Sequence, residues 1–80
     1  MGSCSINALR IGQKGVVIDL NGDEHIVQRL LEMGVTPGCL VQIIRYAPMG
    51  DPVDIKVRGY HLTIRKREAD MILVNPQQDH

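Results

Sequence analysis

The 80-residue sequence predicts a mainly β fold: a small barrel of about five strands with one helix inserted after the first strand. Ile, Val and Leu supply 24 of the 80 residues while Phe and Trp are absent, and branched aliphatic side chains suit the half-buried surface of a sheet. Apolar and polar residues alternate from 53 to 58 and again from 60 to 65, which is the period of a strand with one buried face. Five short strands are too few for two packed sheets, but they can curl into one barrel.

The predicted elements, in chain order, are a lead over 1–7 (with 1–3 compatible with a cloning remnant), a turn-rich entry over 8–15, a strand over 16–20, a helix over 25–33, a strand over 40–47, a loop over 48–52, strands over 53–58 and 60–65, one helical turn over 65–70, a strand over 71–75 and a polar tail over 76–80.

The helix is marked by both of its ends. A turn signal follows the first strand, and its last residue, Asp23, can cap the helix through a side-chain oxygen. Ile26, Leu30 and Met33 then recur at i, i+4 and i+7, which gives one apolar stripe to pack against the barrel. Gly34 follows as the residue that can take the positive φ of a helix stop.

The two alternating strands are expected to form a hairpin. Gly59 separates them and permits a tight turn. Ile55 lies in the middle of the apolar set of its strand, so we expect it to point into the core. Residues 71–75 follow one charged helical turn and are expected to close the fold as a last short strand.

Composition excludes several classes of function. Nine basic and nine acidic residues balance, and the longest apolar runs are far shorter than the roughly 18–20 residues that cross a bilayer. Tyr46 and Tyr60 are the only aromatic residues, too few for a platform that stacks nucleic-acid bases. Neither a Gly-x-Ser-x-Gly motif nor a phosphate-binding loop is present, so we expect no enzyme. Cys4 and Cys39 form no Cys-x-x-Cys pair and no export signal is present, so we expect reduced thiols in the cytosol.

Metal-binding residues are few and scattered. Asp23, Glu24 and His25 are adjacent at the helix start, and Cys39 is a further candidate ligand. The competing interpretation is a helix cap with a solvated first turn, together with a buried cysteine that behaves as a small hydrophobe. Because four converging ligands cannot be assembled from this set, we expect Fe²⁺ or Zn²⁺ to bind weakly, if at all.

The loop between the second and third strands is the candidate partner-binding site. It consists of Pro48, Met49, Gly50, Asp51 and Pro52. Two prolines restrict the free loop, so ordering it on a partner costs little entropy. Met49 would be the apolar anchor and Asp51 a polar contact beside it. The alternative is that Met49 folds back over the barrel and belongs to the core.

A cluster of basic residues allows a weak RNA-binding interpretation. Arg65, Lys66 and Arg67 are consecutive, and Lys56 and Arg58 are expected nearby across the hairpin. A solvated strand end explains the same residues. The balanced charge and the lack of aromatic residues favour this second explanation, so we expect no nucleic-acid partner.

Several short motifs together resemble the ferrous iron transport protein A (FeoA) family. They are GVVI at 15–18, RLLEMGVTPG at 29–38, APMGDP at 47–52, VRGYHLTIR at 57–65, EA at 68–69 and ILV at 72–74. Each motif alone is weak, but their order and spacing are specific. The resemblance covers about residues 8–75 and implies an SH3-like barrel with a helix inserted after the first strand.

The resemblance also implies a function. Members are small cytoplasmic proteins that act on a large GTPase-containing membrane transporter of Fe²⁺, FeoB, and only through it would this chain meet a membrane. The family carries no catalytic residues and no agreed metal site. We therefore expect an adaptor or regulator of bacterial ferrous iron uptake. Two alternatives stay open: a module that binds a divalent transition metal itself, as in metal-dependent repressors that share the domain, and an RNA-binding barrel.

Overall fold

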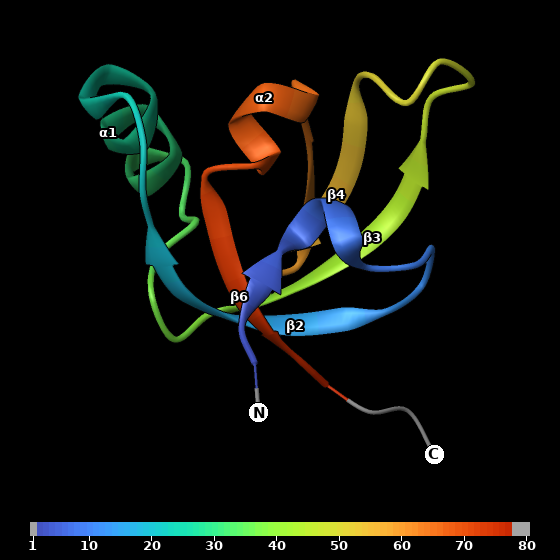
Figure 1. The fold of residues 1–80 in the computed structure, drawn as a ribbon, viewed down its shortest axis with the longest axis horizontal. Helices are drawn as coiled ribbons and strands as arrows, with labels where there is room; N and C mark the ends of the chain where they lie inside the picture. The colour runs from blue at the N-terminus through green and yellow to red at the C-terminus, as the bar shows by residue number, and fades with distance from the viewer. Residues whose placement is uncertain (1, 78–80) are drawn as a thin grey trace.

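The computed structural model describes residues 2–77 and confirms a mainly β fold (Figure 1). Its elements in chain order are β1 (Cys4–Ser5), the 3₁₀ turn η1 (Ile6–Ala8), β2 (Lys14–Leu20), α1 (Glu24–Glu32), β3 (Leu40–Tyr46), β4 (Val53–Val57), β5 (Tyr60–Ile64), α2 (Lys66–Ala69) and β6 (Ile72–Pro76).

The strands form one antiparallel sheet in the order β1-β6-β2-β3-β4-β5. Its register shifts in β2 between Val17 and Asp19 and in β3 between Ile43 and Arg45. Such irregularities bend a strand and increase its twist. The sheet accordingly curls round the core. In Figure 1, β2 lies along the base, β3 climbs from it to the upper right, and β6 descends through the centre.

Both ends of the chain depart from the expected boundaries. Residues 1–7 were expected to be a lead outside the domain, but from Cys4 onward the chain is part of the fold. Cys4 pairs with Val74 in β6, and Ile6 is fully buried. A two-residue strand shows no period of its own, and this one exists only through a partner some seventy residues away. At the other end, Pro76 closes β6 and the Gln77 N–H donates to the carbonyl of Lys14 at 2.8 Å. The remainder of the expected tail, and Met1, lie outside the described residues.

The core is aliphatic, as the composition predicted. Ile55 is fully buried in β4, which confirms the predicted strand faces. Leu30 is the fully buried residue of α1, and Ile26 and Met33 pack against the same core, so the predicted stripe is the packed face. Gly34 follows with φ of 98°. A Cβ at Gly34 would lie 2.8 Å from the hydroxyl oxygen of Tyr60, so glycine is needed for both conformation and space.

The β4–β5 hairpin turns on two residues of positive φ. Arg58 has φ of 52° and Gly59 has φ of 85°, and Val57 pairs with Tyr60 on either side. This is the type I′ pattern, whose twist matches that of the flanking strands. Glycine at the second position was expected. Arginine at the first is unusual, because asparagine, aspartate and glycine are preferred there.

Polar contacts connect the N-terminal segment to α2. Asn7 of η1 donates from Nδ2 to the carbonyl of Lys66 at 3.0 Å and to Oδ1 of Asp70 at 2.8 Å. The Ser5 hydroxyl donates to the same Asp70 oxygen at 3.2 Å. These contacts join β1 and η1 to α2 and to Asp70, the residue that follows it.

Candidate functional site

The 48–52 loop is closed by its own backbone. The Gly50 N–H donates to the carbonyl of Ala47 at 2.7 Å, and the Ala47 N–H donates to the carbonyl of Pro52 at 3.0 Å. Gly50 has φ of 85°, in the left-handed region that glycine enters at no steric cost. The loop is therefore a defined turn between β3 and β4, projecting at the upper right of Figure 1.

Met49 stands at the tip of this turn and is 91% exposed. The interpretation in which Met49 folds back over the core is wrong, because a side chain that covered the core would itself be largely buried. Of the large apolar side chains described, Met49 is the most exposed. An unbranched thioether side chain on a closed turn can adapt to an irregular partner surface.

Asp51 connects the loop to the next helix. Its Oδ1 accepts a hydrogen bond from the Lys66 N–H at 2.9 Å, at the first residue of α2. Asp51, Arg65 and Arg67 line a shallow hollow of about 290 Å³ beside the loop. An apolar tip, a carboxylate and two guanidinium groups thus share one end of the molecule. This arrangement suits binding through mixed polar and apolar contacts.

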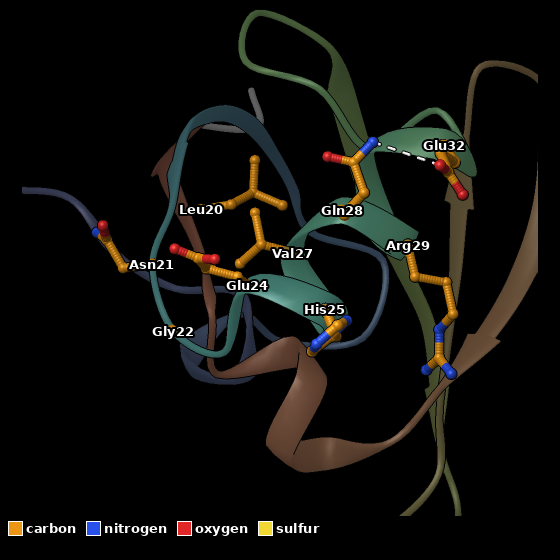
Figure 2. A pocket seen from close by; sticks show the side chains of 9 residues that line it. All are labelled: Leu20, Asn21, Gly22, Glu24, His25, Val27, Gln28, Arg29 and Glu32. Carbon is orange, nitrogen blue, oxygen red and sulfur yellow. Dashed lines mark hydrogen bonds between the residues drawn. The ribbon is translucent and has the colours of Figure 1, made fainter.

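The start of α1 is a capped helix end. Asp23 Oδ1 accepts from the N–H groups of His25 and Ile26 at 2.9 and 3.3 Å, so the predicted cap is confirmed. A wide groove of about 620 Å³ runs over the outer face of α1 and the preceding turn (Figure 2). In that view Glu24 lies on the side of Leu20, while His25 points to the other side of the helix.

The structure separates the four candidate metal ligands. The Asp23 carboxylate is used by the cap, and Glu24 and His25 diverge. Cys39 lies just before β3, is 8% exposed and lines a different groove. Within residues 2–77, no three His, Cys, Asp or Glu side chains are placed to hold one metal ion. The residues therefore do not fit a preformed ion site.

Sequence reasoning missed the ion pair between Arg29 of α1 and Glu68 of α2. The Glu68 side chain is 6% exposed, whereas that of Arg29 is 57% exposed. Glu68 also accepts the Arg65 N–H through Oε1 at 2.8 Å, which caps the first turn of α2. Its place three residues after Arg65 was the available signal, since a glutamate there can cap a helix start. One helical turn was expected over 65–70, and α2 confirms it, but Glu68 was given no partner there.

Two side chains have shifted pKa values, and both are structural. The hydrogen bond from the Thr63 hydroxyl is the largest effect on the pKa of Asp54 and lowers it. Desolvation is the next largest and opposes this shift, while Arg45 and His61 lower the pKa further. Burial raises the pKa of Tyr46, whose hydroxyl donates to the carbonyl of Leu9 at 2.6 Å. Both shifts follow from local hydrogen bonding or burial.

The chain matches the FeoA domain over residues 4–76, nearly its whole length. The chain belongs to the FeoA domain family. The match confirms the predicted family, and it includes the short β1 at which the sequence analysis had placed only a lead.

Similar proteins agree on the fold. The NMR structure of a FeoA-like protein from Clostridium acetobutylicum superposes with a TM-score of 0.91 at 34% identity, covering 100% of this chain and 93% of that one. The crystal structure of FeoA from Stenotrophomonas maltophilia, described as a prokaryotic SH3 domain protein complexed with zinc, gives a TM-score of 0.73 at 27% identity over 88% of this chain and 87% of that one. The predicted SH3-like fold is thereby confirmed.

A curated relative places the domain in ferrous iron transport. It is an Fe²⁺ transport protein A/FeoB transporter fusion protein of Porphyromonas gingivalis, 29% identical over 69 residues. The match covers 86% of this chain but about 8% of the relative. FeoA domains are transport-associated accessory domains. Among the described residues, no helix has both the length and the apolar character needed to span a membrane.

Proposed function

We propose that this chain is a cytoplasmic adaptor or regulator of bacterial ferrous iron uptake that binds an FeoB-type transporter through the 48–52 loop. The observation that carries this proposal is Met49, 91% exposed on a turn closed by two backbone hydrogen bonds. A turn that is ordered before binding loses little entropy on contact. One apolar side chain on it therefore contributes more to affinity than it would on a flexible loop.

The relatives support the choice of partner. In the Porphyromonas gingivalis protein a transport protein A segment and a FeoB transporter are one polypeptide, so the two act within reach of each other. Asp51 and the nearby Arg65 and Arg67 add both signs of charge round the apolar tip. Such a rim selects among partners more than it adds affinity.

The test is Met49→Ala, with binding to the cytoplasmic domain of the transporter and the thermal midpoint measured on the same samples. We expect binding to weaken about tenfold or more, as for an apolar hot spot, while the midpoint is unchanged because Met49 packs on nothing in the core. Ile18→Ala is the matched control, since Ile18 is 48% exposed and lies in β2 near the start of β3, whereas the loop follows the end of β3. Unchanged binding by the Met49 variant would exclude the loop as the contact.

A metal-responsive module is the second candidate, favoured by the zinc complex of the Stenotrophomonas maltophilia relative. Calorimetry of the isolated chain with Zn²⁺ and Fe²⁺ separates the two functions. Tight one-to-one binding that His25→Ala or Cys39→Ser abolishes would favour the module. Transporter binding that is the same with and without Fe²⁺ would favour the adaptor.

A further inference from the structure

The register of the sheet places two lysines in one row on its outer surface. Lys14 of β2 lies opposite Gln42 of β3, and Gln42 lies opposite Lys56 of β4. Strands in a sheet are about 4.8 Å apart, so the row sets two ammonium-bearing side chains about 10 Å apart across one glutamine. Val41 and Val57, one position along their strands, are buried, so alternation directs the row outward.

An exposed leucine lies beside this row. Leu40 is 47% exposed, pairs across the strands with Val16, and lines a groove of about 370 Å³ together with Lys14, Lys56 and Arg58. A single exposed leucine is ordinary on a protein surface. Here, however, three cations surround it and no Asp or Glu lines the groove. The two ion pairs found within residues 2–77 use other residues.

Arg58 is fixed in place at the edge of the groove. Its Nε donates to the carbonyl of Gly34 at 3.0 Å and its Nη2 donates to the hydroxyl of Thr36 at 2.7 Å. Arg58 also has φ of 52°, at a turn position where asparagine or glycine is easier to accommodate. A guanidinium has five N–H donors, so donors remain for a ligand while the side chain is already ordered.

We propose that this basic groove, formed by Lys14, Leu40, Gln42, Lys56 and Arg58, is a second docking surface and binds an acidic protein segment that carries an aliphatic side chain. The carboxylates meet the three cations, and the aliphatic group covers Leu40. Charge complementarity carries the choice of ligand. The groove lies at the start of β3, whereas the 48–52 loop follows the end of β3, so the inference does not depend on what the loop contacts.

The same chemistry argues against other polyanions. Single-stranded nucleic acid needs aromatic faces on which bases stack, and no aromatic residue lines this groove. Anionic membranes are bound by clusters of about four to eight basic residues, and this groove has three round an aliphatic centre. An acidic protein segment with an aliphatic side chain can contact both the three basic residues and Leu40.

The probe is a fluorescently labelled synthetic peptide that alternates glutamate with leucine, and its twin has glutamine in place of every glutamate. We expect the acidic peptide to bind the full chain and to shift amide resonances of β2, β3 and β4 in NMR spectra, while the twin does not bind. Lys14→Glu combined with Lys56→Glu should weaken binding at least about tenfold. Leu40→Ser should weaken it about threefold or more, because the apolar contact is lost. Raising the salt from about 50 mM to about 500 mM should also weaken it, because the contacts are exposed.

Arg67→Glu is the matched control, since it reverses one exposed charge on α2 outside the groove. It should leave affinity within about twofold, as should Met49→Ala in the loop. Thermal midpoints establish that each variant is folded, and Lys14→Gln with Lys56→Gln serves if the double reversal does not fold. Equal binding of the twin peptide, or shifts confined to α2, would overturn the proposal. So would tighter binding of an oligouridine or of phosphatidylserine vesicles at the groove.

Discussion

β4 and α2 lie fewer than ten residues apart in the chain and are stabilised in opposite ways. β4 pairs with a strand on each side and buries Val53, Ile55 and Val57 on one face. α2 has four residues and is held by polar contacts from three distant segments: the 48–52 loop through Asp51, α1 through Arg29, and the η1 segment through Asn7.

The difference shows which kinds of contact can be predicted from a sequence. A buried strand face is recognised from the alternation of apolar and polar residues within a few positions. The neighbouring strands need only show the same alternation. A polar junction needs particular residues from several segments to meet with suitable geometry. Substitutions in the two regions should therefore differ in how much stability they cost and in how far a second substitution restores it.

Ile55→Ala should have the largest effect on stability. Its side chain is fully buried between two paired strands, so truncation leaves a cavity and should cost about 2–5 kcal/mol of unfolding free energy. For a domain of this size that is a large part of the total stability. Urea unfolding followed by circular dichroism measures it.

Lys56→Ala, next in the same strand and exposed, is the control and should change stability by less than about 0.5 kcal/mol. A similar loss for both variants would mean that disturbance of the strand, rather than the cavity, explains the Ile55 result.

Arg29→Ala should have an intermediate effect of about 1–3 kcal/mol. It leaves the Glu68 carboxylate buried with one remaining hydrogen-bond donor, the Arg65 N–H. The loss of stability is reduced because the Arg29 guanidinium is partly solvated in the folded protein, which weakens the ion pair. Chemical denaturation at neutral pH measures the change.

A double variant identifies the cause. Adding Glu68→Gln to Arg29→Ala removes the buried charge while keeping an oxygen for the Arg65 N–H, so it should recover part of the lost stability. A double variant that is less stable than Arg29→Ala alone would contradict the assignment of a buried, charged Glu68.

Thr63→Val should have the smallest effect, visible mainly in a titration. The Thr63 hydroxyl is the main cause of the lowered pKa of Asp54, so its removal should raise that pKa toward the ordinary value. Because the folded pKa lies below the unfolded one, the stabilisation is present above the unfolded pKa and is lost as pH falls through the folded pKa.

The stability difference between Thr63→Val and the original chain should therefore shrink in acid as Asp54 becomes protonated in both. Carboxyl NMR titration gives the pKa directly. Arg45→Ala should also raise this pKa, because Arg45 lowers it both through a hydrogen bond and through its charge. A pKa that does not move in Thr63→Val would exclude the hydroxyl as its cause.

Much of the fold could be predicted because its signals are local. Alternation located Ile55 in the core, and the turn before α1 identified Asp23 as its cap. The candidate loop was located as well, although its exposure at Met49 had to come from the structure. Glu68 was missed because its partner lies 39 residues away, and β1 was missed because it exists only in register with β6. Neither of these long-range pairings produces a periodic pattern that can be recognised in a single sequence.

The pairing of β1 with β6 has a consequence for how the domain can be joined to other proteins. Cys4 lies opposite Val74, so the chain enters and leaves the fold side by side, at the bottom of Figure 1, away from the 48–52 loop. A polypeptide attached at either end would leave that loop uncovered. Such a tether would raise the local concentration of the loop near its target without a new contact. The position of the two ends is thus compatible with attachment of a further polypeptide at either of them.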